Sequence, residues 1–215
     1  MKLYDYFRSS AAFRVRIALN LKGLAVEREF VHLRRREHKA EGYLALNPQG
    51  LVPVLVDDDG TVVTQSLAII EYLDETRPEP PLVPRQPGPR ARVRAISQAI
   101  ACEIHPLNNL RVLGHLTGTF GIDEETRTER WYRHWIAEGL AGVEGLLVNS
   151  PDTGRFCHGA EPTMADCCLA PQIFNAKRFG CELAPYPTVM KVFESWMALD
   201  AFDAAQPSRQ PDAEP

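Results

Sequence analysis

The stretch Arg8-Ser9-Ser10-Ala11-Ala12-Phe13-Arg14-Val15-Arg16-Ile17-Ala18-Leu19 follows a short apolar segment and predicts a strand that turns directly into a helix. Ser9 or Ser10 is suited to the N-cap of that helix. The first N–H groups of a helix lack intrahelical partners and carry partial positive charge, so two hydroxyls at this point also suit an anion. A simple cap and an anion site are both compatible with this stretch.

Length and composition are those of a globular protein. The 215 residues, 45% hydrophobic and 24% charged, fit one large or two small domains. The formal net charge of −4 gives no reason to expect a nucleic-acid or membrane partner, and no apolar run approaches the roughly 20 residues that span a bilayer. The N-terminus lacks the basic-then-apolar order of a signal peptide, and the five cysteines form no disulfide-like framework. We therefore expect a cytoplasmic protein.

A proline-rich segment, RPEPPLVPRQPGPR at 77–90, divides the chain. Proline lacks an amide donor and has a fixed φ, so this segment is interpreted as a linker. The patterns predict an α/β thioredoxin-like domain followed by an all-α domain. The expected boundaries are 1–77 for the first domain, 78–90 for the linker, 91–203 for the helical domain and 204–215 for a disordered tail.

Periodicity and turn residues predict the elements of each part. Before the linker they indicate strands at 2–7, 27–33, 52–57 and 61–64 and helices at 11–22, 39–46 and 66–77. After the linker they indicate only helices, at 90–118 with an interruption at Pro106, and at 123–148, 163–178 and 187–199. Thr163 and Asp166 have the spacing of a capping box with Asp in place of Glu, which predicts a structural role.

Two further motifs have chemical content. Val52-Pro53 puts a proline inside an apolar strand, which fits either an edge strand or a cis bond that turns the Val52 backbone toward an extended ligand. Gln65-Ser66 precedes a helix, where Ser66 can act as an N-cap and can also help to bind a carboxylate. Cys102 and His105 have Cys-x-x-His spacing, but no second ligand pair accompanies them, so we predict no metal site.

These motifs together resemble the zeta class of glutathione transferases, which includes maleylacetoacetate isomerase and maleylpyruvate isomerase. The resemblance runs from Lys2 to about Phe202, and the motifs occur in the family's order and spacing. They are Ser9-Ser10 with the helix after it, Ala45-Leu46-Asn47-Pro48, Val52-Pro53, Gln65-Ser66 and Pro185-Tyr186-Pro187. One departure is Ala11, which stands where the family commonly has cysteine.

The resemblance implies a glutathione-dependent cis–trans isomerase that converts maleylacetoacetate to fumarylacetoacetate. It implies that Ser9, with Ser10 beside it, stabilises the glutathione thiolate. It implies a dicarboxylate substrate held by Arg8, Arg111 and Arg178, with Arg8 also catalytic. The glutathione-binding residues that it implies are Ser9, Ser10, His38, Val52, Pro53, Gln65, Ser66, His105, Asn109 and Arg111. It also implies a homodimer.

Three other functions stay open at this point. They are maleylpyruvate isomerisation, irreversible conjugation of glutathione to electrophiles, and glutathione binding without catalysis. Three cationic side chains favour a dicarboxylate over the apolar substrate of a conjugating enzyme. Arg14 and Arg16 are interpreted as structural residues of the first helix.

Overall fold

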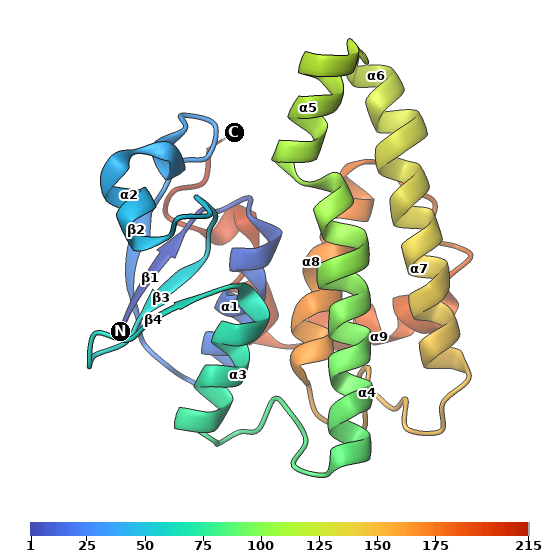
Figure 1. The fold of residues 1–215 in the computed structure, drawn as a ribbon. Helices are drawn as coiled ribbons and strands as arrows, with labels where there is room; N and C mark the ends of the chain where they lie inside the picture. The colour runs from blue at the N-terminus through green and yellow to red at the C-terminus, as the bar shows by residue number, and fades with distance from the viewer. Residues whose placement is uncertain (215) are drawn as a thin grey trace. The chain divides into compact units, whose positions relative to one another are not determined.

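The computed structural model describes residues 1–214, and the chain divides into two compact units (Figure 1). Unit 1 comprises Met1–Val83 and the chain from Leu199 onward, and unit 2 comprises Pro84–Ala198. The elements of unit 1 are β1 (Lys2–Asp5), α1 (Ser10–Leu21), β2 (Glu27–Phe30), η1 (Glu37–Lys39), α2 (Glu41–Leu46), β3 (Val54–Val56), β4 (Val62–Thr64), α3 (Ser66–Thr76), α10 (Asp200–Asp203) and η5 (Pro207–Arg209).

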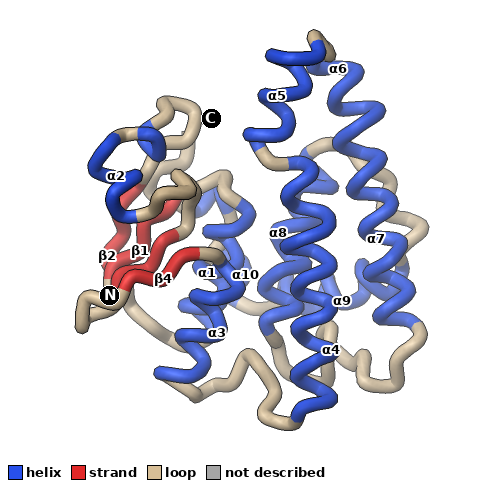
Figure 2. The backbone as a smooth tube through the Cα atoms, in the orientation of Figure 1, coloured by secondary structure: helices blue, strands red, loops and turns tan. Residues whose placement is uncertain are grey.

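Unit 1 contains one four-stranded sheet in the order β2-β1-β3-β4 (Figure 2). β1 and β2 are parallel, with Lys2 opposite Glu27, and α1 connects them. β3 lies antiparallel to β1, and β4 antiparallel to β3. This is the thioredoxin-like arrangement expected for the first domain.

The three helices that the sequence predicts for the first domain begin and end within two residues of the expected positions. Ser9 caps α1, and Gly23 follows it with φ of +63°, a conformation that glycine adopts without steric cost. α1 packs against α3, and both bury their apolar faces in the core. The completely buried core side chains of unit 1 include Leu3, Val15, Ile17, Val54, Leu55, Ile69, Ile70 and Leu73.

The expected linker at 78–90 is longer than the observed connection, because its first residues belong to unit 1 and its last residues belong to a helix. Lys22 Nζ, which is buried, donates to the carbonyl oxygen of Pro80 at 2.8 Å, and Asp74 accepts the backbone N–H of Leu82 at 2.7 Å. These bonds hold the start of the proline-rich segment in unit 1. At its other end, Pro87 begins α4 (Pro87–Gln98), because proline is favoured where a helical N–H has no partner.

The expected disordered tail is also wrong. The chain after 199 forms α10 and η5, and its polar groups bond to unit 1. Asn20 Nδ2 donates to the carbonyl oxygen of Ala201 at 2.9 Å, and Arg28 Nη2 donates to Gln210 Oε1 at 3.1 Å. The composition of this segment predicts disorder because it carries no information on the residues that bond to it. Those residues, Asn20 and Arg28, lie far away in the sequence.

Unit 2 contains helices and no strand among the residues that the structure describes, as expected. They are α4, η2 (Ala99–Ile104), η3 (His105–Asn108), α5 (Leu110–Phe120), α6 (Glu124–Thr126), η4 (Arg127–Tyr132), α7 (Arg133–Val148), α8 (Met164–Arg178) and α9 (Pro187–Met197). η2 and η4 are π-helical and η3 is a 3-10 turn. In the described chain, no helix combines the length and apolarity needed to cross a membrane.

The predicted capping box is present at the start of α8. Asp166 Oδ2 accepts the backbone N–H of Thr163 at 2.8 Å, and Asp166 Oδ1 accepts Trp196 Nε1 and the Cys157 N–H, both at 2.9 Å. Asp166 is completely buried, and burial raises its pKa. The carboxylate therefore joins α8, α9 and the preceding loop, which is the structural role expected of it.

Candidate active site

The turn between β1 and α1 places two serines at the start of a helix. Ser9 Oγ accepts a hydrogen bond from the backbone N–H of Ala12 at 3.2 Å. Because the oxygen is the acceptor in this bond, the hydroxyl hydrogen can donate to an anion beside the helix N-terminus. Ser10 is buried in the first turn of α1, whereas Ser9 is half-buried. Ser9 is therefore the more exposed residue of the pair.

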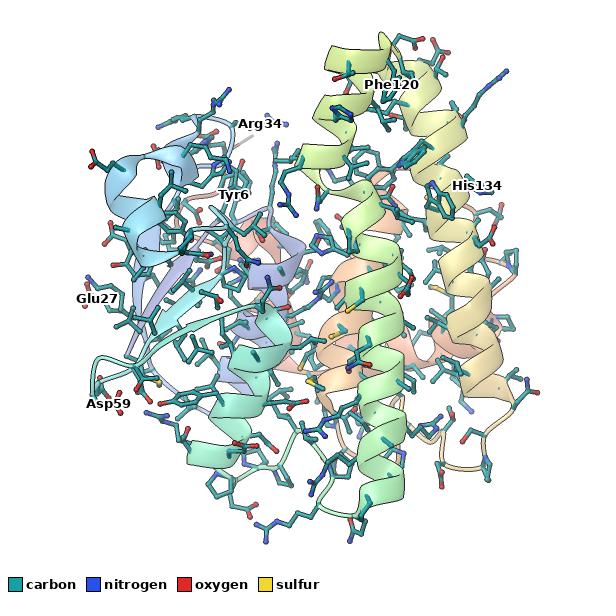
Figure 3. The ribbon with its side chains drawn as sticks, in the orientation of Figure 1. Tyr6, Glu27, Arg34, Asp59, Phe120 and His134 are labelled. Carbon is teal, nitrogen blue, oxygen red and sulfur yellow. The ribbon has the colours of Figure 1, made fainter. Side chains whose placement is uncertain are left out.

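A buried arginine holds the backbone just before these serines. The Arg16 guanidinium donates to Asp5 Oδ1 at 2.9 Å. It also donates to the carbonyl oxygens of Phe7 at 3.0 Å and Tyr6 at 3.4 Å; Tyr6 is labelled in Figure 3. Burial lowers the Arg16 pKa, and the Asp5 carboxylate opposes that shift. Breaking a buried ion pair is strongly destabilising, so Arg16 fixes the turn that carries Ser9.

The C-terminal segment contacts the same turn. Asp212 Oδ2 accepts the backbone N–H of Phe7 at 2.9 Å, and the carbonyl oxygen of Glu214 accepts Arg8 Nη2 at 3.3 Å. The Arg8 guanidinium lies 4.9 Å from the centre of the Phe7 ring. Sequence reasoning found Arg8 but missed both acidic residues, because it treated their segment as disordered.

Glu214 lies among cationic and imidazole groups. Its carboxylate is 2.7 Å from Arg35 Nη2 and 3.1 Å from His32 Nε2. The hydrogen bond to His32 is the main reason that the pKa of Glu214 lies below its ordinary value. The His32 ring also contacts the Tyr6 ring, with 5.1 Å between their centres. The region around Arg8 is thus rich in positive charge, and Glu214 offsets part of it.

The start of α3 forms a second polar site in unit 1. Gln65 precedes the helix with φ of +71°, a strained conformation for a residue with a side chain, and such strain is found mainly at functional sites. Ser66 is the first residue of α3, and its Oγ accepts a hydrogen bond from Arg14 Nη1 at 3.1 Å. Gln65 Nε2 donates to Gln49 Oε1 at 2.7 Å. The Val52–Pro53 bond is cis, one of the two alternatives expected from the sequence.

His38, in η1, contributes an unsatisfied buried atom. Its Nδ1 is buried and has no hydrogen-bond partner within residues 1–214. Burial lowers the pKa of His38, and the neighbouring charges of Lys39 and Arg36 lower it further, which favours the neutral imidazole at pH 7. Gly50 lies against this segment so closely that a Cβ there would come within 2.9 Å of the His38 carbonyl oxygen.

In unit 2, the segment His105–Arg111 and Arg178 are connected through Tyr132. Asn108 Nδ2 donates to the Tyr132 carbonyl oxygen at 3.4 Å, and the Tyr132 ring lies 3.9 Å from the Phe179 ring, centre to centre. Burial raises the pKa of Tyr132, and the nearby charge of Arg178 opposes that shift. Arg178 is exposed at the last position of α8.

Asn109 and Arg111 begin α5. Asn109 is its N-cap, and Asn109 Oδ1 accepts the backbone N–H groups of Arg111 at 2.9 Å and Val112 at 3.2 Å. The Arg111 side chain is exposed. His105 lies in η3, in the same part of unit 2. Among the described residues, no cluster of three or more His, Cys, Asp or Glu side chains is placed to hold a metal ion.

The predicted site residues thus fall into two groups. Unit 1 contains Arg8, Ser9, Ser10, His38, Val52, Pro53, Gln65 and Ser66. Unit 2 contains His105, Asn109, Arg111 and Arg178. Sequence reasoning missed the contact of Arg14 with Ser66, although Arg14 follows Ser10 by four residues and so lies on the same face of α1.

Known proteins resemble this chain over its whole length. The family model for the glutathione S-transferase N-terminal domain matches residues 8–76. Maleylacetoacetate isomerase of Rhizobium meliloti is 51% identical over 207 residues, 96% of each chain. Maleylpyruvate isomerase of a Ralstonia species is 46% identical over 213 residues, 99% of this chain and 100% of the other.

Solved structures give the same result. The holo structure of a bacterial zeta-class maleylpyruvate isomerase has a TM-score of 0.95 at 46% identity and covers both chains completely. A maleylacetoacetate isomerase from Methylobacterium extorquens AM1, crystallised with malonate and glutathione, has a TM-score of 0.96 at 46% identity, again with complete coverage. The fold and both units of this chain therefore have solved counterparts.

Proposed function

This chain belongs to the zeta class of glutathione transferases, and we propose that it is a glutathione-dependent cis–trans isomerase that converts maleylacetoacetate to fumarylacetoacetate. The observation that carries the proposal is that the chain is 51% and 48% identical, over nearly its whole length, to two proteins named as maleylacetoacetate isomerase and probable maleylacetoacetate isomerase. The accessible Ser9 hydroxyl at the N-terminus of α1 supports it, because the reaction needs a stabilised sulfur anion.

The residues of unit 1 fit glutathione. The unpartnered Nδ1 of His38 can bond to a polar group of a peptide. Ser66 and the free backbone N–H groups at the start of α3 suit a carboxylate, which we assign to the γ-glutamyl end, with Gln65 beside it. Val52 and Pro53 lie in the loop before β3 and present backbone to an extended ligand.

Ser9 has the central role in the chemistry. Glutathione supplies a thiolate that adds reversibly to one carbon of the cis double bond and turns it into a single bond. Rotation about this bond follows, and loss of the thiolate re-forms the double bond in the trans geometry. An unperturbed thiol has a pKa of about 8.5, and a hydroxyl donor favours the charged form and lowers that value. The Ser9 hydroxyl provides such a donor without a general base, and the buried Ser10 supports the same helix terminus.

Three arginines would bind the dicarboxylate. Arg8 adjoins the serine pair, and its positive charge suits the oxygen that becomes negative when the double bond is attacked. Arg111 and Arg178 are exposed in unit 2 and suit carboxylates, to which guanidinium groups bind in a bidentate manner. We assign His105, Asn109 and Arg111 to glutathione as well. Asn109 Nδ2 stays available as a donor, because the capping bonds use only its oxygen.

The second candidate is maleylpyruvate isomerisation, favoured by the 46% identity to a maleylpyruvate isomerase. Steady-state kinetics with both substrates decide between the two. A higher kcat/KM for maleylacetoacetate supports our proposal, and the reverse order supports the alternative. Turnover of neither, with conjugation of simple electrophiles, would indicate a general transferase. Glutathione binding without any turnover would indicate a binding protein.

We also propose that the protein is a cytoplasmic homodimer. Two-fold dimers are the commonest soluble oligomers, and the β3–β4 hairpin displays an apolar side chain, since Val62 is 45% exposed. The pairing would use this hairpin and α4, the first long helix of unit 2. All five cysteines are free thiols, as in a reducing compartment. A mass near 24 kDa by light scattering at micromolar concentration would refute the dimer.

A further inference from the structure

We infer that Arg14 is a positioning residue for the γ-glutamyl carboxylate of glutathione and acts through the hydroxyl of Ser66. This inference rests on the proposed function, because it deepens the site assigned to Ser66. Arg14 lies on α1 and is only 2% exposed, and its Nη1 donates to Ser66 Oγ at 3.1 Å. Ser66 is itself 5% exposed, so the bond is shielded from water on both sides.

The direction of this hydrogen bond decides what Ser66 can offer a ligand. A serine hydroxyl has one hydrogen to donate and two lone pairs that accept. Arginine has only donors, so the bond from Arg14 must occupy a lone pair of the Ser66 oxygen. The Ser66 hydrogen is then directed away from Arg14, toward an acceptor. A carboxylate is an acceptor-only group when ionised, so Arg14 prepares Ser66 for an anion.

The charge of Arg14 acts in the same direction. It lies next to the N-terminus of α3, where the backbone N–H groups of the first turn already favour an anion. A cationic side chain at low exposure is weakly screened by solvent. Arg14 thus adds positive potential at the point where the carboxylate binds, without touching the ligand.

The position of Arg14 also connects the two parts of the unit 1 site. It follows Ser10 by four residues in α1, and helical residues at this spacing are neighbours on one face. Its guanidinium reaches α3. The same helix therefore carries the serines proposed for the thiol at its first turn and, one turn later, the side chain that orients the hydroxyl for the carboxylate.

The test compares two ligands by calorimetry. One is glutathione, and the other is 4-aminobutyryl-cysteinylglycine, which is glutathione without the α-carboxylate of its γ-glutamyl residue. We expect R14M to weaken glutathione binding roughly tenfold, the lower end for a hydrogen bond to a charged group. Binding of the analogue should stay within about twofold of wild type. Equal weakening of both ligands would show that Arg14 is only structural and would overturn the inference.

A double-mutant cycle adds a second test. If Arg14 acts through Ser66, the loss of glutathione binding in the S66A/R14M double variant should be clearly smaller than the sum of the two single losses. Both changes remove the same hydrogen-bonded pair, and R14M then removes only the longer-range charge in addition. Additive losses in Kd would contradict the inference. The kcat of R14M at saturating glutathione should remain close to wild type, since this contact is far from the sulfur.

Two variants keep the test decisive. R16K is the matched control, since Arg16 is as deeply buried on the same helix but bonds to the turn before Ser9; it should not discriminate between the two ligands. If R14M does not fold, R14Q replaces it, because glutamine keeps an N–H donor without the charge, and it should weaken only glutathione. If wild type itself binds both ligands equally, the γ-glutamyl assignment fails, and the proposed function is judged separately by turnover.

Discussion

The backbone N–H of Phe7 donates a hydrogen bond to Asp212 Oδ2 at 2.9 Å and so joins residues 205 positions apart in sequence. Phe7 is buried and lies two residues before Ser9. The C-terminal segment is therefore part of the framework of the turn that carries Ser9.

Replacing Asp212 should lower both the stability of the protein and its turnover rate. In Asp212→Ala the Phe7 N–H loses its acceptor, and an unsatisfied buried donor costs about 1–3 kcal/mol. We expect a lower urea midpoint with an unchanged slope, and a reduced kcat because the turn that carries Ser9 loosens. Asp212→Asn, which keeps an acceptor oxygen, is the matched control and should lose less. An unchanged midpoint in the alanine variant would show that the contact contributes nothing.

Ser9→Ala should lower turnover by roughly ten- to a hundredfold. A hydrogen bond to a charged group contributes about 1.5–3 kcal/mol, which corresponds to that factor in rate. Glutathione affinity should change little, because the bond is to the sulfur alone. The thiol pKa of bound glutathione, followed by thiolate absorbance, should rise. Ser10→Ala is the comparison: if it does the greater damage, the assignment within the pair is wrong, and full activity in the double variant would refute the mechanism.

Ser66→Ala should raise the KM for glutathione markedly and leave kcat at saturating glutathione near wild type. The γ-glutamyl end is far from the reacting atoms, so its contacts are equally strong in the ground and transition states. Calorimetry of glutathione binding measures the loss directly. Unchanged affinity would mean that the tripeptide binds elsewhere in the protein.

Arg178→Ala should have the opposite effect and weaken the organic substrate roughly tenfold while glutathione binding survives. The reason is the loss of one charge-assisted contact to a carboxylate. The KM for maleylacetoacetate and the Kd for glutathione, measured on the same variant, separate the two effects. Arg178→Lys keeps the charge and should recover part of the KM. A weakened Kd for glutathione would contradict the assignment of Arg178 to the substrate.

The ion pair of Asp57 should make stability fall in acid. Asp57 accepts hydrogen bonds from Arg77 and the Tyr72 hydroxyl, and these hold its pKa well below the ordinary value, with Arg77 the main cause. A carboxyl with a depressed folded pKa stabilises the protein above its unfolded pKa of about 3.9 and loses that contribution as pH falls further. The gap in unfolding free energy between wild type and Asp57→Asn should therefore be full at pH 7 and shrink below about pH 4. A pH-independent gap would contradict this.

Much of the fold could be predicted because its boundaries have local signals. Ser9, Gly23 and the turn at 57–60 mark element ends, and the capping box marks the start of α8. The helix break near Pro106 comes slightly later, at Asn109, because proline is accepted in the first turn of η3. Such boundaries depend on a few neighbouring residues, which a sequence displays directly.

Long-range partners could not be predicted in this way. Polar residues near the C-terminus are typical of a disordered tail. Only the structure shows that Phe7 and Arg28 bond to them. Arg14 and Arg16 were expected to be structural residues of the first helix, and both are buried and bonded, but the sequence does not identify their acceptors. Only the folded chain brings their acceptors close, so motifs and family resemblance suggest candidate site residues but not the long-range contacts that support them.

The division of unit 1 into two pieces of sequence has a consequence for biosynthesis. Residues 199–214 are translated after all 115 positions of unit 2, from Pro84 to Ala198, and they include the acceptor of the Phe7 N–H. A nascent chain that has completed its sheet and both serines still lacks this contact. In a ribosome-bound chain, the turn that carries Ser9 should thus reach its final form only after the whole helical unit has left the exit tunnel. A chain that terminates early after Ala198 should therefore have reduced activity even though every residue proposed to bind a ligand is present.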